Sequence, residues 1–184
     1  TALHGKWYAG PGKTFFDLMT QKFGQTPFIA EDLGIITDAV QLLKDCYHFP
    51  GLKILLFAFD SLDEKHPYLP KNYEKNCIGY IGTHDNSPFF EYVKQNQNGF
   101  LNMKKYYQTV DENTTYEAIM DDLFASDANV IILQIQDILK QDEKSRMNVP
   151  GSDQGNWQYR ITHNDFDFKK YEFIVKLTIK HQRD

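Results

Sequence analysis

With 184 residues, the chain is long enough for one domain with a substantial core. Its formal net charge is -5 and its acidic and basic residues are mixed, so nothing in the composition indicates a surface for nucleic acid. Residues 1–10 lack the pattern of a secretory leader, and no window approaches the roughly 18 apolar residues of a membrane span. We therefore expect a soluble, cytoplasmic protein.

Two short patterns that often indicate ligand sites do not hold here. The segment Gly10–Thr14 is similar to the end of a phosphate-binding loop, but that pattern requires glycine where Trp7 stands. Cys46 and Cys77 belong to no CxxC or histidine-rich cluster, so a reduced setting without a disulfide or zinc site is the simplest interpretation. The aromatic content of 15% would suit stacking on sugar rings, but it would suit an ordinary core equally well.

The first predicted elements form a strand-helix-strand unit. Helical spacing over Phe15–Phe23 ends at Gly24, and Pro27–Ala30 follows as a short buried strand. A helix capped by Thr37 then precedes a buried strand over Lys53–Phe59. The apolar face of that helix is formed by Val40, Leu43 and Tyr47.

The same alternation continues to the end of the chain. Buried strands are predicted over Ile78–Ile81 and Val130–Leu133, and a closing amphipathic helix over Asp165–Ile179. Further helical segments are expected near Phe89–Val93 and Tyr116–Phe124. Because parallel neighbours need a crossover helix, this pattern predicts an α/β fold with a parallel sheet. No repeat or linker interrupts it, so we expect a single domain over residues 1–184.

Acidic residues follow two of these strands. Glu31 and Asp32 come after the first, and Asp85 comes after the strand over Ile78–Ile81. Catalytic groups gather at the C-terminal strand ends of parallel α/β proteins, and glycosidic chemistry requires paired carboxylates. We therefore expect Glu31 and Asp85 on one rim, facing a shared cleft. The alternatives are an acidic start to a following helix for Glu31 and Asp32, and an Asx-type turn for Asp85.

Five motifs occur in one order along the chain. They are Phe28–Gly34 (FIAEDLG), Phe49–Phe59 (FPGLKILLFAF), Tyr68–Tyr73 (YLPKNY), Tyr80–Asn86 (YIGTHDN), and Arg146–Gly151 (RMNVPG) with Gly155–Trp157 (GNW). Together they resemble the 4-α-glucanotransferases, also called amylomaltases or disproportionating enzymes, of glycoside hydrolase family 77. The resemblance extends from about Gly5 to Arg160 in family order, which argues against coincidence.

The resemblance implies a TIM-type (β/α)8 barrel. A complete barrel needs roughly 250 residues, so this chain would supply its C-terminal half, about strands five to eight and the C-terminal helix. The family mechanism is retaining: an α-1,4-glucan is cleaved to a glycosyl-enzyme, which is passed to the 4-hydroxyl of an acceptor glucan or glucose. The expected partners are thus maltooligosaccharides and other α-1,4-glucans, with no nucleic acid, membrane, metal or organic cofactor.

The resemblance assigns catalytic roles to two acids. Glu31 matches the general acid/base, which must hold its proton near neutral pH. Asp85 matches the acid that stays ionised, stabilises the oxocarbenium-like transition state and binds the sugar ring. His84 matches a histidine that hydrogen-bonds ring hydroxyls of the donor sugar, with a histidine satisfied inside its own loop as the alternative.

Four further residues match positions that contact sugar, and each has an ordinary structural alternative. Phe57 and Asp60 resemble acceptor-side residues, although Phe57 would serve almost equally as a core residue of a buried strand. Asn148 and Asn156 match loops that complete the sugar site, although turn-forming asparagine competes with that role. Arg146 is expected to form an ion pair that holds this loop rather than to contact substrate.

The sequence departs from the family pattern at two places. After Asp85 and Asn86 the usual acid-threonine pair is replaced by Ser87 and Pro88, which alters the loop but leaves the acid. The family's nucleophilic aspartate belongs to an Arg-x-Asp-His-type motif that does not occur here, and the segment from Thr1 resembles family sequence that follows it. Without a nucleophile there is no covalent intermediate, so we expect a piece of a longer enzyme that is inactive alone.

Two other functions stay open on this evidence. An amylase-type α-glucan hydrolase would use the same carboxylate chemistry, and a stand-alone half-barrel could bind glucan without catalysis. The coding sequence upstream of Thr1 would separate a truncated enzyme from a stand-alone module. A half-barrel also leaves unpaired strand edges, so we expect the isolated chain to self-associate or to be only marginally stable.

Overall fold

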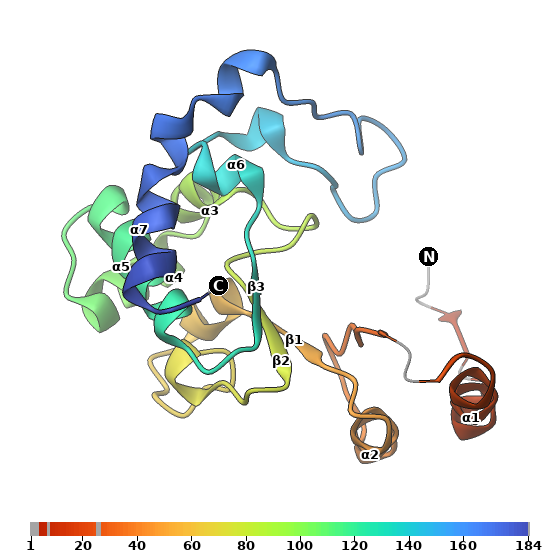
Figure 1. The fold of residues 1–184 in the computed structure, drawn as a ribbon. Coiled ribbons are helices and arrows are strands. Elements are labelled where there is room, and N and C mark those ends of the chain that lie inside the picture. The colour runs from red at the N-terminus through yellow and green to blue at the C-terminus, as the bar shows by residue number, and fades with distance from the viewer. Residues whose placement is uncertain (1–3, 7, 25–26, 184) are drawn as a thin grey trace. The chain divides into compact units, whose positions relative to one another are not determined.

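A computed structural model describes residues 4–6, 8–24 and 27–183 of the chain. The chain divides into two compact units, Thr1–Leu52 and Lys53–Asp184. Helices alternate with strands that pair in parallel, so the predicted α/β class is confirmed (Figure 1). The single domain over residues 1–184, as part of a larger barrel, stays a prediction.

The first unit holds helices α1 (Gly12–Phe23) and α2 (Asp38–Cys46). As the sequence predicts, α1 ends at Gly24, which adopts φ 73° and donates its N–H to the Thr20 carbonyl. Thr37 stands at the predicted N-cap position of α2, but its side chain makes no capping hydrogen bond. The positive φ at the C-terminal end of α1 therefore explains the glycine at position 24. Thr37 precedes α2, but its hydroxyl does not stabilise the start of that helix.

An aromatic cluster forms the interior of the first unit. The ring of Phe16 in α1 lies between 5.0 and 5.8 Å from the rings of Phe28, Tyr47 and Phe49. The sequence predicts a buried strand over Pro27–Ala30, and this prediction is wrong about its length. Only Ala30 pairs, through a parallel bridge to Gly51, and the side chain of Ile29 is 53% exposed. Phe28 is held by ring packing instead of a strand ladder.

The sheet has three strands in the order β1-β2-β3, namely β1 (Gly51–Ile54), β2 (Cys77–Tyr80) and β3 (Val130–Ile132). The β2–β3 pair is parallel, with Gly79 opposite Ile131. The strand predicted over Lys53–Phe59 ends early, because the chain tightens into the 3-10 helix η2 (Leu55–Asp60) after Ile54. The predicted burial of the last strand is also wrong, because Val130 and Ile132 are 45% and 41% exposed.

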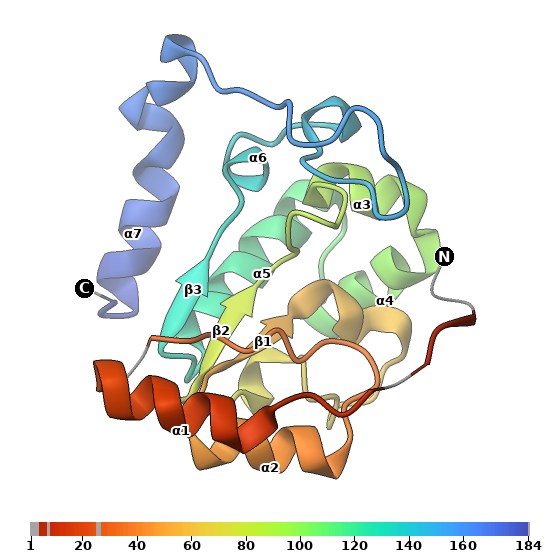
Figure 2. The ribbon, with the colours of Figure 1, turned by 90° about the vertical axis from the view of Figure 1, so that its right-hand side faces the viewer.

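Helices α3 (Phe89–Gln95), α4 (Gln97–Tyr107) and α5 (Glu112–Ala125) lie on one side of β2 and β3 (Figures 1 and 2). Of these, α3 and α5 are predicted from the sequence and α4 is not. Their apolar side chains form the core with η2, and fully buried members are Leu55, Phe59, Phe89, Met103, Ile119 and Leu123. The close approach of α5 to β2 requires glycine, since an added Cβ at Gly79 would stand 3.0 Å from Cδ1 of Leu123.

Short 3-10 turns and the two helices α6 and α7 complete the second unit. The helix predicted over Asp165–Ile179 divides into the 3-10 turns η5 (His163–Phe166) and η6 (Phe168–Tyr171), followed by α7 (Glu172–Lys180). The remaining short elements are η3 (Pro70–Asn72), α6 (Ile135–Ile138) and η4 (Glu143–Ser145). No helix in the described part of the chain is both long and apolar enough to cross a bilayer.

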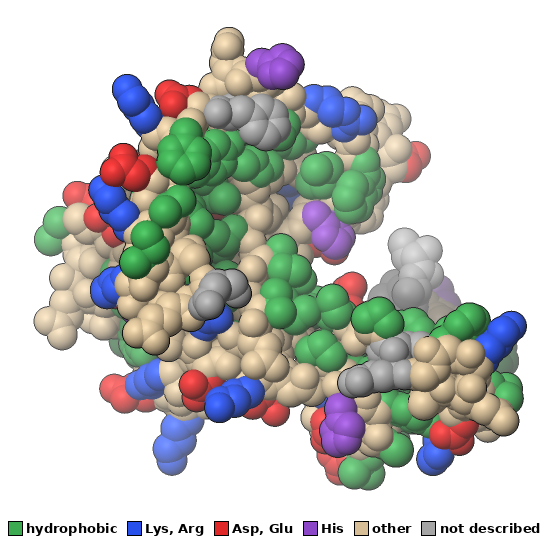
Figure 3. All heavy atoms as spheres, viewed as in Figure 1, with side chains coloured by type: hydrophobic (Ala, Val, Ile, Leu, Met, Phe, Trp, Pro, Cys, Tyr) green, Lys and Arg blue, Asp and Glu red, His purple; other side chains and the backbone are tan. Residues whose placement is uncertain are grey.

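Exposed apolar side chains lie on β3 and α7. Val130, Ile132, Val175 and Ile179 are between 38% and 71% exposed. Figure 3 shows hydrophobic side chains over these two elements, with charged groups mainly at the margins. An apolar run in the sequence indicates that a strand is suited to burial, but it does not say which segment covers it. In the described part of the second unit, no segment fully covers the side chains of Val130 and Ile132 on β3.

Candidate functional site

The loop after β2 is built around a turn that Thr83 and Asn86 close between them. The Thr83 N–H donates to Oδ1 of Asn86 at 2.8 Å, and the Asn86 N–H donates back to the Thr83 carbonyl at 2.9 Å. The turn-forming side chain is therefore Asn86, not Asp85. Gly82 allows the turn to sit close to η2, because an added Cβ there would lie 3.0 Å from Cδ1 of Leu56.

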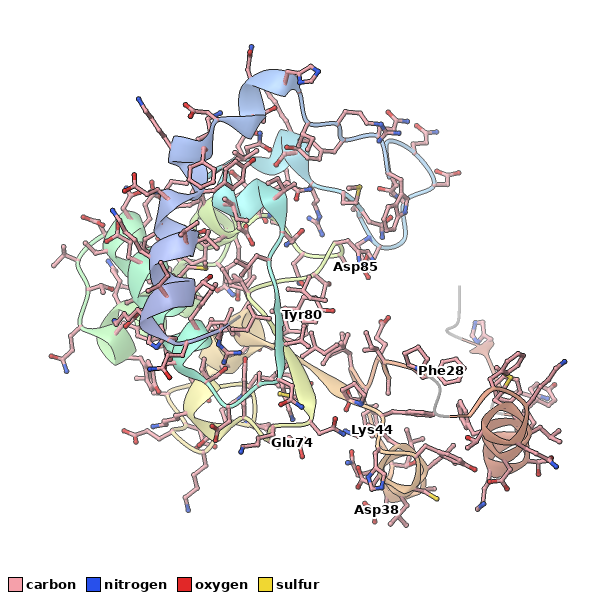
Figure 4. The ribbon with its side chains drawn as sticks, in the orientation of Figure 1. Phe28, Asp38, Lys44, Glu74, Tyr80 and Asp85 are labelled. Carbon is pink, nitrogen blue, oxygen red and sulfur yellow. The ribbon has the colours of Figure 1, made fainter. Side chains whose placement is uncertain are left out.

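The carboxylate of Asp85 is thereby available to partners outside its own turn (Figure 4). Nδ2 of Asn148 donates to Oδ1 of Asp85 at 2.6 Å, and Nε2 of His84 lies 3.4 Å from the same oxygen. The Asn148 N–H also donates to the His84 carbonyl at 3.1 Å. The side chains of Asp85 and His84 remain 41% and 49% exposed. Three of the predicted site residues are thus brought together at the C-terminal side of β2.

Arg146 ties the loop of Asp85 to the loop of Asn148. Its guanidinium donates to the Asp85 carbonyl at 2.7 Å, to Oγ of Ser87 at 3.0 Å and to the Asn148 carbonyl at 3.0 Å. It also pairs with Glu143, whose Oε1 lies 3.0 Å from the same nitrogen that bonds Ser87. The expected ion pair that holds this loop is therefore present. The planar, multi-donor guanidinium suits this task better than an ammonium group.

Trp157 is a residue of this cluster that spacing alone does not assign. Its ring lies 5.0 Å from the His84 ring, and its side chain is 56% exposed. The backbone N–H of Trp157 donates to the Met147 carbonyl at 2.7 Å, which closes the loop. The signal in the sequence is the glycine-flanked tryptophan in Gly155–Trp157. An exposed indole beside hydrogen-bonding groups can stack on a flat apolar ligand face.

The other predicted residues lie outside this cluster or face away from it. Asn156 uses its amide within its own loop, accepting from Val149 N–H and donating to the Ser152 carbonyl, both at 2.9 Å. Phe57 is 37% exposed whereas its neighbours in η2 are buried, so the core alternative for Phe57 is wrong. Asp60, at the end of η2, is exposed. The sugar-binding roles of these three residues stay predictions.

Glu31 belongs to the first unit and is exposed. It is the central residue of a three-residue turn, in which the Asp32 N–H donates to the Ala30 carbonyl at 3.0 Å. The alternative for Glu31 and Asp32, an acidic start to the following helix, is wrong: α2 begins six residues after Asp32, at Asp38. Among residues 4–6, 8–24 and 27–183, no group of three or more His, Cys, Asp or Glu could hold a metal ion.

Replacing Arg146 by lysine is expected to loosen both loops, because one ammonium group cannot make the four contacts of the guanidinium. Backbone hydrogen exchange at Asn148 should become roughly tenfold faster or more, since each hydrogen bond to a charged group contributes about 1.5–3 kcal/mol. Arg160→Lys is the matched control, because among the residues that the structure describes that arginine bonds only the nearby carbonyls of Trp157 and Tyr159. If the exchange rate at Asn148 did not change in Arg146→Lys, Arg146 would not be the residue that holds the two loops together.

Comparison with known proteins identifies the family. The family model described as 4-alpha-glucanotransferase (glycoside hydrolase family 77) matches residues 1–165. The chain belongs to this family. A 4-alpha-glucanotransferase of Aquifex aeolicus is 38% identical over 184 residues, which cover 96% of this chain and 36% of the relative. Another from Synechocystis sp. is 40% identical over 186 residues, with 96% of this chain and 36% of the relative covered.

A solved structure supports the same assignment. The amylomaltase from Streptococcus agalactiae in complex with acarbose has a TM-score of 0.89 and 30% sequence identity to this chain, covering 97% of it and 36% of the amylomaltase. The chain thus spans about a third of the length of these 4-α-glucanotransferases. The family prediction made from the five motifs is confirmed.

Proposed function

We propose that this chain is the C-terminal part of a 4-α-glucanotransferase, which moves segments of α-1,4-glucan to the 4-hydroxyl of an acceptor glucan or glucose. The observation that carries the proposal is the held carboxylate of Asp85, with Asn148 at 2.6 Å and His84 beside it, after a parallel strand. Family membership over residues 1–165 supports it. The solved neighbour holds acarbose, which is consistent with an α-glucan ligand for this chain.

The proposed mechanism gives different tasks to the two acids. Glu31 donates a proton to the glycosidic oxygen that leaves, and in the second step it accepts the proton of the incoming 4-hydroxyl. Asp85 stays ionised and stabilises the positive charge that develops at the anomeric carbon. The nucleophile is an aspartate outside the 184 residues, and the covalent glycosyl-enzyme forms on it.

The residues around Asp85 would bind the donor sugar. Asn148 keeps Asp85 in one orientation, and His84 offers a ring nitrogen to a sugar hydroxyl. The exposed Trp157 ring offers an apolar face to a pyranose. Phe57, exposed on η2, together with Asp60 would contact the acceptor side. Asn156 would act by shaping the Val149–Ser152 turn, where its amide bonds are made.

The half-barrel architecture is part of the same proposal. The strand order β1-β2-β3, the parallel pairing of β2 with β3 and the helices on one side of these two strands are consistent with a segment of a (β/α)8 barrel (Figure 2). The exposed side chains of Val130 and Ile132 on β3 would be covered by barrel elements from the rest of the enzyme. In their absence, such a surface favours self-association of the isolated chain.

The test is a disproportionation assay with maltotriose as the only substrate. The whole enzyme should release glucose and form longer maltooligosaccharides, whereas the 184-residue chain alone should form neither, because a retaining transfer needs a nucleophile about 5 Å from the acid/base. Products are separated by chain length. Reducing-sugar release without longer products in the whole enzyme would indicate an amylase-type hydrolase. Glucan binding without turnover in the whole protein would indicate a binding module, and either result would overturn the proposal.

A further inference from the structure

Asp32, the residue after Glu31, has both carboxylate oxygens engaged inside the first unit. Oδ1 accepts a hydrogen bond from the Leu52 N–H at 2.8 Å, and Oδ2 lies 2.8 Å from Nζ of Lys44, which extends from α2 (Figure 4). The side chains of Lys44 and Asp32 are only 8% and 11% exposed. A buried ion pair has a large desolvation cost, so added stability is a weak explanation for it.

The start of β1 is shaped to admit this carboxylate. An added Cβ at Gly51 would stand 2.2 Å from Oδ2 of Asp32, which is closer than the atoms can approach. Gly51 also pairs with Ala30 in the parallel bridge. The peptide of Glu31 is therefore fixed on both sides, by the bridge at Ala30 and by the contact from Asp32 to Leu52. The Asp32 N–H to Ala30 carbonyl bond closes the turn around Glu31.

We propose that Asp32 is a positioning residue, which acts by holding the turn so that the Glu31 carboxyl is presented in one direction. The inference rests on the proposed role of Glu31 as acid/base. Lys44 serves to neutralise the buried Asp32 carboxylate, and Gly51 leaves the space that this carboxylate occupies. Proton donation depends on alignment, and a displacement of about 1 Å can lower a rate by about 10²-fold.

Two double variants of the whole enzyme separate the anchoring hydrogen bond from the buried charge. Asp32→Asn with Lys44→Met removes both charges but keeps an oxygen that can accept from Leu52 N–H. Asp32→Ala with Lys44→Met removes both charges and the anchor. We expect kcat on maltotriose to stay near the parent value in the asparagine pair and to fall by roughly 10- to 100-fold in the alanine pair.

The choice of donor distinguishes positioning from general damage. An α-maltosyl fluoride donor needs no proton on its leaving group, and azide as acceptor needs no general base. With this donor and acceptor, kcat of the Asp32→Ala, Lys44→Met variant should fall by less than about threefold. This decrease is much smaller than the decrease expected on maltotriose, where Glu31 must be aligned. Gly51→Ala, which displaces Asp32 from the other side, should show the same dependence on the donor. The exposed pair Lys13 and Asp17 is the matched control, as Lys13→Met with Asp17→Asn.

The outcomes separate this inference from the proposed function. If Glu31→Gln is inactive on maltotriose and the alanine pair shows the donor-dependent loss, the positioning role is supported. If Glu31→Gln is inactive but the alanine pair loses equally on both donors, Asp32 is merely structural and the inference is overturned. Retained transfer by Glu31→Gln on maltotriose would instead overturn the proposed function itself.

Discussion

Replacing Glu31 by glutamine in the whole enzyme is expected to lower kcat for transfer from maltotriose by about 10²- to 10⁴-fold, the usual contribution of a positioned general acid. Glutamine has nearly the same shape but carries no proton that it can give to a leaving sugar oxygen. The exposed position of Glu31 in the first unit means that the substitution removes no core packing. Folding and glucan binding should therefore be retained, and the loss should appear in kcat.

The donor again provides the decisive measurement. With α-maltosyl fluoride as donor and azide as acceptor, neither step needs proton transfer by residue 31, so the glutamine variant should release fluoride at a rate within about tenfold of the parent, well below the general-acid contribution. Glu74→Gln is the control, because Glu74 is 60% exposed and lies 3.7 Å from Lys53 in an ordinary surface pair. Equal loss on both donors would mean that Glu31 does not act as the acid.

The second large effect concerns stability. Asp137 in α6 is 1% exposed, and burial raises the pKa of its carboxyl to about 7, although the Phe89 N–H donates to Oδ1 at 2.6 Å. Within the described part of the chain, its Oδ2 has no hydrogen-bond partner. The native state therefore holds a proton that the unfolded chain releases near pH 4. Its stabilising contribution is present below pH 4 and is lost as the pH rises to about 7.

Asp137→Asn should remove this dependence on pH. Asparagine can still accept from Phe89 and imitates the protonated acid, so parent and variant should unfold with similar free energies near pH 4. At pH 8 the variant should be more stable by up to about 4 kcal/mol, the free energy that corresponds to a carboxyl pKa raised from near 4 to about 7. The measurement is urea unfolding of the whole enzyme from pH 4 to 8.

Asp111→Asn provides a control of opposite sign. Asp111 caps α5, and the Thr114 N–H at 2.8 Å holds the pKa of its carboxyl below the ordinary value. Any decrease in the free energy of unfolding caused by Asp111→Asn should be present at neutral pH and should disappear in acid. If the difference in unfolding free energy between the parent and Asp137→Asn did not change with pH, the raised pKa of the Asp137 carboxyl would be contradicted.

The sequence by itself determines the features that depend on neighbouring residues. Gly24 ends α1 because glycine adopts its positive φ without strain, and apolar spacing predicts α3, α5 and the position of β2. The run of motifs determines the family, because residue identities in order are a property of the chain alone. The placement of Asp85 in the loop after β2 follows from the same local information.

The tertiary structure decides which residue does which task. Asp85 and Asn148 are 63 positions apart, and only folding shows that Asn86 forms the turn while Asn148 holds the carboxylate. The apolar run after Lys53 suits a strand or a 3-10 helix equally, and packing selects η2, which exposes Phe57. Asp32 meets Lys44 twelve positions on, through a space left by Gly51. Local propensity cannot identify such partners, because their contact energy exists only when both segments are in place.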